Sequence, residues 1–370
     1  MTRILHLRSS NVFSGPEVLI LDLLKFGDRS RIQQYLARIN RREFETNRKF
    51  VEAAEALKVE TTLLRYKKRF GIGLLFEVRS FAKKHAIDIF HSHSYRDDVI
   101  GALVAPTVGA RKVATIHGWI GRDYWQKSLD MRLLRGFDAV IAVSEEIYDE
   151  LADGGMAPDR LHLIPNGIDF GAFRKREDSG LRTQLGYSER EFVIGMMSRV
   201  EPEKNIDMLI NIAGKLLEFI PGARFLVVGD GTQLDYLKEL ARSNGVADKT
   251  CFTGFREDVE ALLQIMDIFC VPSSTEGLPR SLLEALACEK LVIASRVGGM
   301  PEAICDGESG LLLPEPTEAY LFEALSQAWN MGPAARGEMG KRGRAFAQKK
   351  FDIGEMVRKT EDVYRGIALK

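Results

Sequence analysis

Residues 268–284 have the sequence IFCVPSSTEGLPRSLLE, in which a short apolar stretch is followed by a loop and then by a helical pattern. The apolar run Ile268–Val271 is typical of a buried parallel strand, and Pro279 suits the first turn of the helix that follows. Glu276 would then lie in the loop at the carboxyl end of a strand, where open α/β sheets bind ligands. The segment predicts a strand–loop–helix unit with a ligand site in its loop.

The same alternation of short apolar runs and longer helical patterns extends along the whole chain, which is typical of parallel sheets with crossover helices. In the second half we expect strands at Phe192–Met197, Arg224–Val228, Thr250–Thr253, Ile268–Val271, Leu291–Ala294 and Gly310–Leu313. Helices are expected between them at Ile206–Phe219, Leu234–Asn244, Asp258–Gln264 and Ser281–Ala287. In the first half we expect strands at Arg3–Leu7, Gln34–Ile39, Ile87–Ser92, Val113–Ile116, Ala139–Val143 and Leu161–Ile164, with a helix at Gly15–Phe26.

This pattern predicts an α/β protein of two successive doubly wound, Rossmann-like domains, which also fits a length of 370 residues. The boundary should fall in the polar stretch 169–188. We expect a first domain at 1–168, a second at 169–350, and a final segment at 351–370. That last segment contains the amphipathic pattern Ile353–Ile367, and our hypothesis is that it crosses back to the first domain.

The composition limits the class of protein. The chain has 52 basic and 52 acidic side chains and is 45% hydrophobic, which excludes wholesale disorder and argues against a nucleic-acid binder. No apolar run approaches the 18 residues of a membrane-spanning helix, and the apolar core of Met1–Ser10 is too short for a signal peptide. Cys251, Cys270, Cys288 and Cys305 form no Cys-x-x-Cys pair, so we expect reduced core residues in a cytoplasmic protein.

The balanced total charge hides a basic first half. Residues 1–180 carry 29 basic and 24 acidic side chains, whereas residues 181–370 carry 23 and 28. Basic residues at 65, 67–69, 79, 83 and 84 flank an apolar stretch at 72–76. This pattern fits a helix that lies on an anionic membrane surface, at the inner face of the membrane. It fits equally a solvated helix face whose leucines pack into the core.

A second segment, residues 198–207, places cations at the same end of the sheet. Arg199 stands at the end of the first expected strand of the second half, two residues after Met197, and Lys204 lies five residues further on, near a helix start. A guanidinium and an ammonium in this position suit a diphosphate, whereas the carboxylates of Glu276 and Glu284 would accept hydrogen bonds from sugar hydroxyls. The alternative is that Glu276 caps its helix and Glu284 is a solvent-exposed residue.

Three other patterns are weaker. Gly229-Asp230-Gly231 follows an expected strand, but Leu234 stands where a dinucleotide fingerprint needs glycine. His91 and His93 share one face of a strand and could ligate a metal, but no cysteine or acidic ligand set lies nearby, which favours a packed or site-lining role. No Asp-x-Asp triplet occurs in the sequence, so a metal-bridged diphosphate has no support. Trp119 and Trp125 could border an acceptor site or simply pack.

Taken together, these segments resemble glycosyltransferase family 4, the retaining nucleotide-sugar transferases of GT-B fold. The resemblance covers nearly the whole chain. Its motifs in the second half are Ser198-Arg199, Pro202-Glu203-Lys204, Val227–Gly231, Phe252–Phe255, the Glu276/Glu284 pair, Val297–Glu302 and Asp306–Gly310. In the first half they are His91–Ser94, Thr115–Gly118 and Pro165–Asp169. The resemblance implies two Rossmann-like domains that face each other across a cleft, an acceptor-binding one first and a donor-binding one second.

The resemblance also implies roles for individual residues. Arg199 and Lys204 would hold the donor diphosphate, and Glu284 would bind the ribose. Glu276 and the amides of Gly277 and Leu278 would contact the transferred sugar, with His117 over the reaction centre. Two backbone segments complete the expected donor site. These are the first glycine loop, at Ser14 and Gly15, and the nucleobase contact, at Gly254, Phe255 and Arg256.

The first glycine loop departs from the family pattern. The family commonly has paired glycines there, whereas this chain has Phe13-Ser14-Gly15-Pro16-Glu17. Ser14 can still offer an amide, but Pro16 cannot donate one. Glu17 could face the acceptor or cap the helix.

The resemblance implies a hexosyltransferase that uses a nucleoside diphosphate sugar, with UDP favoured, and a saccharide or lipid-linked acceptor in polysaccharide or glycolipid assembly. We expect no cofactor, no metal and no nucleic-acid partner. Two alternatives stay open: a nucleotide-sugar epimerase of the same fold, and a non-catalytic subunit that binds nucleotide or glycan.

Overall fold

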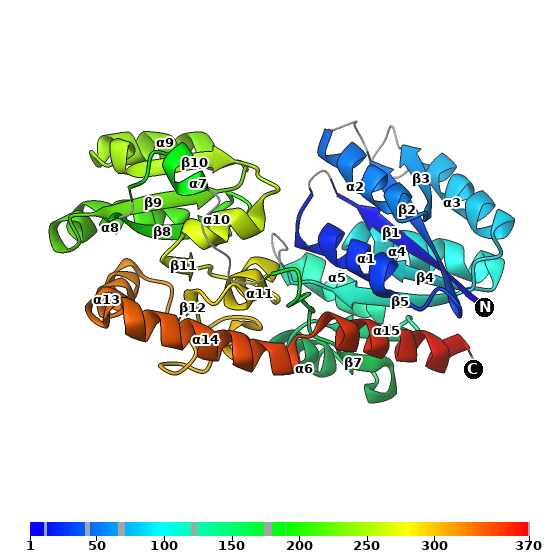
Figure 1. Cartoon of the computed structure of the whole chain (residues 1–370). Coiled ribbons are helices and arrows are strands. Elements are labelled where there is room, and N and C mark those ends of the chain that lie inside the picture. Colours follow the sequence, from blue (N-terminus) through cyan, green and yellow to red (C-terminus); the bar gives the residue numbers. More distant parts are fainter. Residues whose placement is uncertain are drawn as a thin grey trace. The chain divides into compact units, whose positions relative to one another are not determined.

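The computed structural model describes residues 1–10, 13–40, 45–65, 71–119, 124–173, 180–188 and 190–368 (Figure 1). The chain forms two compact units. The first contains Met1–Gly167 and Ile353–Lys370, and the second contains Ile168–Asp352. The last helix of the chain therefore belongs to the first unit, although the whole second unit precedes it in the sequence. Among the described residues, no helix combines the length and apolar character needed to cross a membrane.

The first unit is a parallel sheet of seven strands in the order β3-β2-β1-β4-β5-β6-β7. The strands are β1 (Thr2–Ser9), β2 (Ile32–Asn40), β3 (Glu60–Arg65), β4 (Ile89–Ser92), β5 (Arg111–Ile116), β6 (Ala139–Ala142) and β7 (Leu161–Leu163). The chain builds outward from β1 to β3 and then returns to the other side of β1. The strand order therefore reverses between β1 and β4, and open α/β sheets bind ligands at such a switch point.

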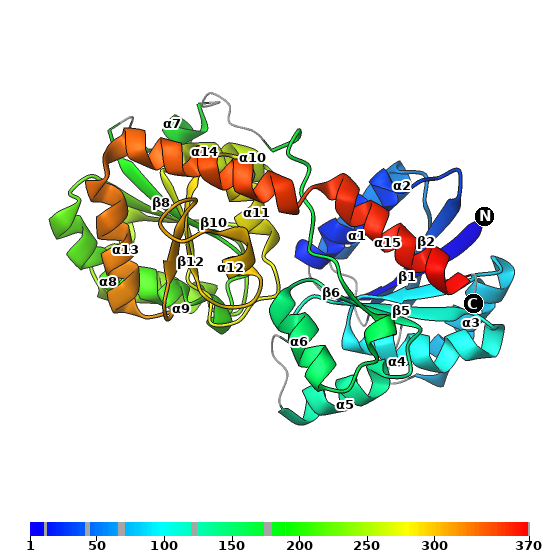
Figure 2. The same cartoon turned by 90° about the horizontal axis from the view of Figure 1, so that it is seen from below.

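Helices cover both faces of this sheet. They are α1 (Gly15–Phe26), α2 (Glu45–Ala56), α3 (Ile72–Lys84), α4 (Tyr95–Val104), α5 (Tyr124–Leu134), α6 (Glu145–Asp153) and α15 (Ile353–Ala368), with short 3-10 turns at Ala105–Val108 and Pro158–Arg160. α3 and α4 share a core with Leu5 and Leu7 of β1, whereas α1 and α15 share a core with Ile4 on the opposite face. Both views of the cartoon show α15 beside α1 (Figures 1 and 2).

The second unit is a parallel sheet of six strands in the order β10-β9-β8-β11-β12-β13. Its strands are β8 (Phe192–Met197), β9 (Ala223–Val228), β10 (Thr250–Gly254), β11 (Ile268–Val271), β12 (Leu291–Ser295) and β13 (Leu311–Leu313). The order reverses between β8 and β11, which is the switch point of this sheet.

The helices of the second unit also lie on both faces. They are α7 (Leu181–Gln184), α8 (Ile206–Phe219), α9 (Leu234–Ser243), α10 (Val259–Ile265), α11 (Arg280–Ala287), α12 (Met300–Ala303), α13 (Glu318–Asn330) and α14 (Gly332–Lys350), with 3-10 turns at Pro202–Lys204 and Ala247–Lys249. One core joins the sheet to α8, α9 and α13. α11 and α14 contact each other, and α14 also contacts β12.

The doubly wound α/β class predicted from the sequence is confirmed, and the structure adds or shifts several details. The edge strand β3 and the long helix α14 were not expected. Pro279 lies just before the first residue of α11 rather than inside its first turn. All four cysteines are free thiols, but Cys251 and Cys305 are only partly buried, so the expectation of four core residues is wrong for these two. Burial raises the pKa of the Cys288 thiol to about 12.

The apolar side chains of the basic segment of the first unit are partly buried and partly exposed. Leu74 and Val78 of α3 are buried in the core, whereas Ile72 and Phe76 on the same helix are 72% and 63% exposed. Residues 67–69 and the side chain of Arg65 lie outside the described residues, and so does the side chain of Trp125.

Candidate active site

A buried ion pair lies at the switch point of the second unit. Lys204, just before α8, and Glu276, in the loop after β11, are joined by 2.6 Å between Lys204 Nζ and Glu276 Oε1, and both side chains are 8% exposed. The Ser273 hydroxyl donates a second hydrogen bond to the same Oε1, at 2.8 Å. Glu276 therefore binds Lys204 rather than capping α11, and Ser273 is a site residue that sequence reasoning missed.

The two loops that carry this pair are tied together by backbone groups. The Asn205 side-chain amide donates to the Pro272 carbonyl at 2.8 Å, and the Ser274 N–H donates to the Glu203 carbonyl at 2.9 Å. Asn205 has a φ of 51°, in the left-handed region that asparagine tolerates better than most residues. These contacts fix Lys204 at the carboxyl end of β8 and Glu276 at the carboxyl end of β11.

Glycines allow neighbouring loops to press against this site. A Cβ on Gly298 would lie 2.4 Å from the Glu276 carbonyl oxygen, and Gly298 also has a φ of 57°. In the same way, a Cβ on Gly229 would lie 1.8 Å from the Ser198 carbonyl oxygen, and one on Gly231 would lie 2.3 Å from that of Val200. The Gly229-Asp230-Gly231 sequence is therefore explained by close backbone packing against the loop that carries Arg199.

The other candidate residues of this unit also have partners. Arg199 lies two residues beyond β8 and is joined to Glu203 at 3.0 Å, with a third of its side chain exposed. Arg280 donates to Glu284 on α11 at 2.9 Å, and Glu284 is buried.

The remaining residues named for the donor lie on two further loops. Gly277 accepts a hydrogen bond from the Gly299 N–H, and Leu278 is buried. Gly254 ends β10, Phe255 after it is exposed, and Arg256 pairs with Asp258.

In the first unit, Glu17 holds the loop that follows β1. The Ser14 N–H and hydroxyl donate to Glu17 Oε2 at 3.0 and 2.8 Å, while Arg8 and Arg38 approach Oε1 at 2.6 and 3.3 Å. Burial alone would raise the pKa of Glu17, but the two guanidinium groups outweigh it and hold that pKa at about 2. Glu17 is fully buried, which favours the helix-start role over contact with an acceptor.

This arrangement bears on the expectation that the amides of Ser14 and Gly15 contact the donor. The Ser14 N–H already donates to Glu17, and Pro16 has no N–H, so the amide of Gly15 is the one that stays available among residues 14–16.

Four histidines of the first unit lie close together near the ends of β1, β4 and β5. His6 Nδ1 is 3.2 Å from His93 Nε2, and His93 Nδ1 is 3.4 Å from His117 Nε2. His91 contacts the Tyr364 hydroxyl of α15 at 2.6 Å and the Thr115 hydroxyl at 2.7 Å. Sequence reasoning missed His6, because its neighbours come from other strands and only the sheet register brings them together.

All four imidazoles are held in the neutral form. Burial lowers the pKa of His6 to about 4 and that of His117, which also lies near Arg8, to about 3. Burial and the neighbouring imidazoles hold the pKa values of His91 and His93 well below the ordinary value.

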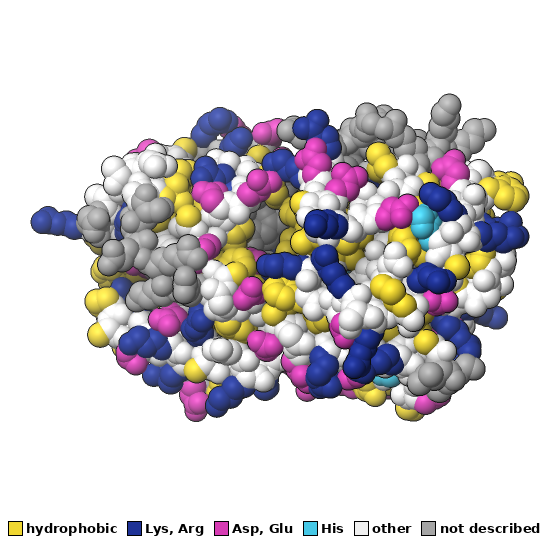
Figure 3. Space-filling view, turned by 45° about the vertical axis from the view of Figure 1, so that its right-hand side comes forward, with side chains coloured by type: hydrophobic (Ala, Val, Ile, Leu, Met, Phe, Trp, Pro, Cys, Tyr) yellow, Lys and Arg dark blue, Asp and Glu magenta, His cyan; other side chains and the backbone are white. Residues whose placement is uncertain are grey.

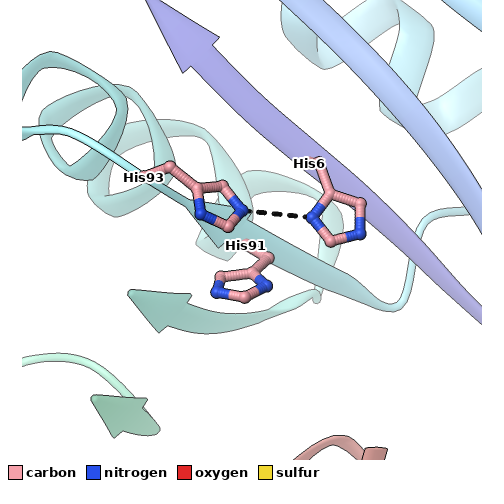
Figure 4. Close-up of side chains that lie close together, drawn as sticks. All are labelled: His6, His91 and His93. Carbon is pink, nitrogen blue, oxygen red and sulfur yellow. Dashed lines mark hydrogen bonds between the residues drawn. The ribbon is translucent and has the colours of Figure 1, made fainter. Parts of the chain in front are cut away.

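One nitrogen each of His6, His91 and His93 lies within 4.8 Å of the others, which makes this trio a candidate metal site among the described residues (Figure 4). However, every ring nitrogen of the trio already has a hydrogen-bond partner in the protein. Binding a metal would break at least the His6–His93 hydrogen bond. The geometry therefore fits a packed, hydrogen-bonded network better than a metal centre.

Comparison with known proteins shows what this fold and these motifs belong to. A family model described as "Glycosyltransferase Family 4" matches residues 13–171, and one described as "Glycosyl transferases group 1" matches residues 179–346. The chain is 26% identical over 302 residues to N-acetyl-alpha-D-glucosaminyl L-malate synthase of Bacillus anthracis, covering 80% of this chain and 79% of that protein. It is 28% identical over 313 residues to alpha-maltose-1-phosphate synthase of Mycolicibacterium smegmatis, covering 76% and 80%.

Solved structures share the fold over nearly the whole length. HepE of Anabaena, in complex with UDP and glucose, has a TM-score of 0.87 at 23% identity, covering 99% of this chain and 100% of that one. Sucrose-phosphate synthase of Thermosynechococcus elongatus has a TM-score of 0.81 at 19% identity, covering 99% of both chains. The chain therefore belongs to the family 4 and group 1 glycosyltransferases, and it is a glycosyltransferase of GT-B fold.

Proposed function

We propose that this glycosyltransferase moves a hexosyl group from a UDP-sugar to an acceptor hydroxyl with retention of anomeric configuration, in polysaccharide or glycolipid assembly. The observation that carries the proposal is the buried Lys204–Glu276 pair at the switch point between β8 and β11. It offers a cation for a diphosphate and a carboxylate for sugar hydroxyls at one place. The preference for UDP is supported by HepE of Anabaena, whose solved complexes contain UDP and UDP-glucose.

The proposed roles are those that the resemblance to the family implies. Lys204 and Arg199 bind the diphosphate and neutralise the charge that develops on the leaving group. Glu276 accepts hydrogen bonds from the transferred sugar, helped by the Gly277 and Leu278 amides. The other proposed contacts are Glu284 to the ribose, residues 254–256 to the nucleobase, the Gly15 amide to a phosphate, and His117 to the sugar at the reaction centre.

The reaction that suits these groups is a substitution on one face of the sugar. The bond between the anomeric carbon and the phosphate oxygen breaks, and a bond from that carbon to the acceptor oxygen forms. The acceptor proton moves to the leaving phosphate. Fixed cations and amides stabilise the departing diphosphate, so the proposal includes no resident metal ion.

Calorimetric titration with UDP, GDP, ADP and dTDP, without divalent metal, tests the donor site. We expect one nucleotide, UDP, to bind, and Lys204→Met to weaken it about 100-fold, because a charge-assisted contact to phosphate is lost. The control is Lys215→Met, at an exposed lysine of α8, which should bind as the parent does. Absence of binding by any nucleotide to the folded protein would contradict the proposal.

Loss of a buried charge could unfold the site instead of weakening the ligand contact, so a second variant is needed. Lys204→Met leaves Glu276 as an unpaired buried charge, which costs about 3–5 kcal/mol of stability. Lys204→Met/Glu276→Gln removes both charges and should recover most of that stability without recovering nucleotide affinity. Transfer assays with and without acceptor then separate a transferase from an epimerase, which consumes donor alone.

We further propose that the acceptor is presented at an anionic membrane surface. Ile72, Phe76, Arg79 and Lys83 recur at helical spacing along α3, and Ile72 and Phe76 are exposed. Basic and acidic side chains are interspersed on the face shown in Figure 3, so such an attraction would be local. Sedimentation with anionic vesicles at low salt should show binding that Ile72→Ser/Phe76→Ser and high salt both reduce. Equal sedimentation of parent and variant would contradict this.

A further inference from the structure

A chain of hydrogen bonds leads from β2 to His117 through two buried histidines. The Gln34 Oε1 lies 2.8 Å from His6 Nε2, His6 Nδ1 lies 3.2 Å from His93 Nε2, and His93 Nδ1 lies 3.4 Å from His117 Nε2. Figure 4 shows the central bond of this chain, between His6 and His93. The four residues come from β1, β2 and the loops after β4 and β5.

The first member of the chain has a fixed orientation. The Gln34 side-chain nitrogen donates to the Leu23 backbone carbonyl at 2.8 Å. A carbonyl oxygen only accepts, so the nitrogen of the Gln34 amide must face Leu23 and its oxygen must face His6. An amide oxygen also only accepts, and therefore His6 Nε2 carries the proton.

The remaining members follow in sequence, because a neutral imidazole has one N–H and one lone pair. His6 is protonated on Nε2, so its Nδ1 accepts and His93 Nε2 must donate. His93 Nδ1 then accepts, and His117 Nε2 must donate. Burial keeps the pKa values of His6 and His93 well below neutral, which means that neither ring carries a second proton that would break this order.

We propose that Gln34 is a positioning residue that sets the tautomers of His6, His93 and His117 in series, so that His117 presents Nδ1 to the substrate as a hydrogen-bond acceptor. The consequence for catalysis rests on the proposed function, in which His117 contacts the sugar. His117 then accepts a hydrogen bond from a sugar hydroxyl and has no proton on Nδ1 to donate to a phosphate or carbonyl oxygen. The protonation state of His117 Nδ1 is thus set by the side-chain amide of Gln34, through His6 and His93.

The tautomers can be measured directly in the full-length protein. Selective ¹⁵N-labelling of the six histidines gives imidazole spectra in which protonated and unprotonated nitrogens are well separated, and His6→Asn, His93→Asn and His117→Asn assign them. We expect His6, His93 and His117 all to carry their proton on Nε2. A spectrum in which His117 carries it on Nδ1 would overturn the proposal, whether or not the protein transfers sugar.

A variant that reverses the chain tests the role of Gln34. Gln34→Lys places a group that only donates beside His6 Nε2, and it can still donate to the Leu23 carbonyl. All three tautomers should then invert, and kcat should fall about 10-fold or more, with KM for the nucleotide sugar changing less, because His117 Nδ1 becomes a donor. Gln33→Lys, on the exposed neighbouring position of β2, should leave spectra and kinetics unchanged.

Two further measurements keep the outcomes distinct. If Gln34→Lys does not fold, Gln34→Met removes the orienting amide, and the spectra should then show a mixture of tautomers. An unchanged single tautomer would overturn the proposal.

Metal analysis of the purified protein tests the alternative that His6, His91 and His93 bind a metal ion. Stoichiometric zinc, lost in His6→Asn, would also overturn it, because a metal at His6 Nδ1 and His93 Nε2 replaces the hydrogen bond on which the series depends. A parent protein that shows the expected tautomers but transfers no sugar would instead count against the proposed function alone.

Discussion

At the scale of single residues, the candidate donor site depends on its glycines as much as on its charged side chains. Gly298 lies in the loop after β12, and its Cα faces the backbone of Glu276 so closely that a Cβ would lie 2.4 Å from the carbonyl oxygen. The loop that carries Glu276 contacts the Gly298 loop on one side and is hydrogen-bonded to the Lys204 loop on the other, so the Lys204–Glu276 pair depends on both contacts. A change at Gly298 should therefore affect the site without touching any charged group.

Gly298→Ala should lower the free energy of unfolding by about 2–4 kcal/mol and reduce nucleotide affinity as well. The cost combines a left-handed backbone that alanine adopts poorly with a clash against backbone atoms that cannot move aside. Gly307→Ala is the matched control, since Gly307 has a φ of 75° but no atom within 4 Å of an added Cβ. It should cost about 1 kcal/mol and leave nucleotide binding intact. Urea unfolding and calorimetry check both, and equal effects of the two variants would contradict the close-packing explanation.

At the scale of helices and strands, the sequence predicted best where burial alone shapes the pattern. The strands Phe192–Met197 and Ile268–Val271 and the helices Gly15–Phe26 and Ile206–Phe219 have the predicted bounds. A continuous apolar run between polar loops is typical of a buried strand or helix, so the bounds of these elements follow from the sequence pattern.

The missed elements have physical reasons. β3 is an edge strand with the polar sequence ETTLLR, so it lacks an apolar run. α14 contains glycines that lower helix propensity, yet a Cβ on Gly340 would lie 2.0 Å from the Glu289 carbonyl oxygen, so this glycine permits contact rather than breaking the helix.

Some residues of the candidate site could also be predicted from the sequence, and others could not. Arg199, Lys204 and Glu276 could be proposed from the sequence because the carboxyl ends of neighbouring strands meet at one edge of a sheet. The link from Gln34 to His6 and His93 could not, because it depends on the register of three strands. Ile4 lies opposite Gln34, and His6 lies opposite His91, which only the sheet determines.

α15 is the last helix of the chain, but it packs into the core of the first unit. Its buried side chains recur three and four residues apart, at positions 353, 356, 357, 360, 363, 364 and 367, so one face of the helix completes the core of the first unit. Glu361 also accepts from the Asp28 N–H at 2.7 Å, after α1. The first unit therefore cannot complete its core until the last residues of the chain are present.

Tyr364→Ala should destabilise the first unit by about 3–5 kcal/mol, because it empties a fully buried site and removes the hydroxyl that contacts His91. Arg365→Ala, one position along on the exposed face of α15, should change stability by no more than about 0.5 kcal/mol. Urea unfolding followed by the fluorescence of Trp119 and Trp125 checks this, in a Trp329→Phe background that silences the second unit. A small effect of Tyr364→Ala would show that α15 is not part of this core in solution.

At the scale of the whole molecule, the histidines are distributed unevenly. All six lie within residues 1–167, and residues 168–352 contain none. His6, His91 and His93 are buried in the neutral form, with pKa values that burial lowers, to about 4 for His6. In the unfolded chain each would titrate near its ordinary value of about 6.5. The two units should therefore respond differently to mild acid.

We predict that lowering the pH from 7 to 5 destabilises the first unit and leaves the second nearly unchanged. Between pH 6.5 and 4 the unfolded histidines bind protons that the folded ones do not, so this contribution to stability is complete above about pH 6.5 and is lost as the pH falls. Each buried imidazole contributes up to about 1.4 kcal/mol per pH unit. His117, with a pKa of about 3, acts in the same direction as these three imidazoles. The buried Asp97, whose pKa burial raises, acts in the opposite direction, but it is one carboxyl against four imidazoles. Urea unfolding midpoints at pH 7 and pH 5 check this. The variant Trp329→Phe reports on the first unit and Trp119→Phe/Trp125→Phe reports on the second, so that each unit is the control for the other. Equal shifts of the two midpoints would mean that the histidines are not buried as neutral groups.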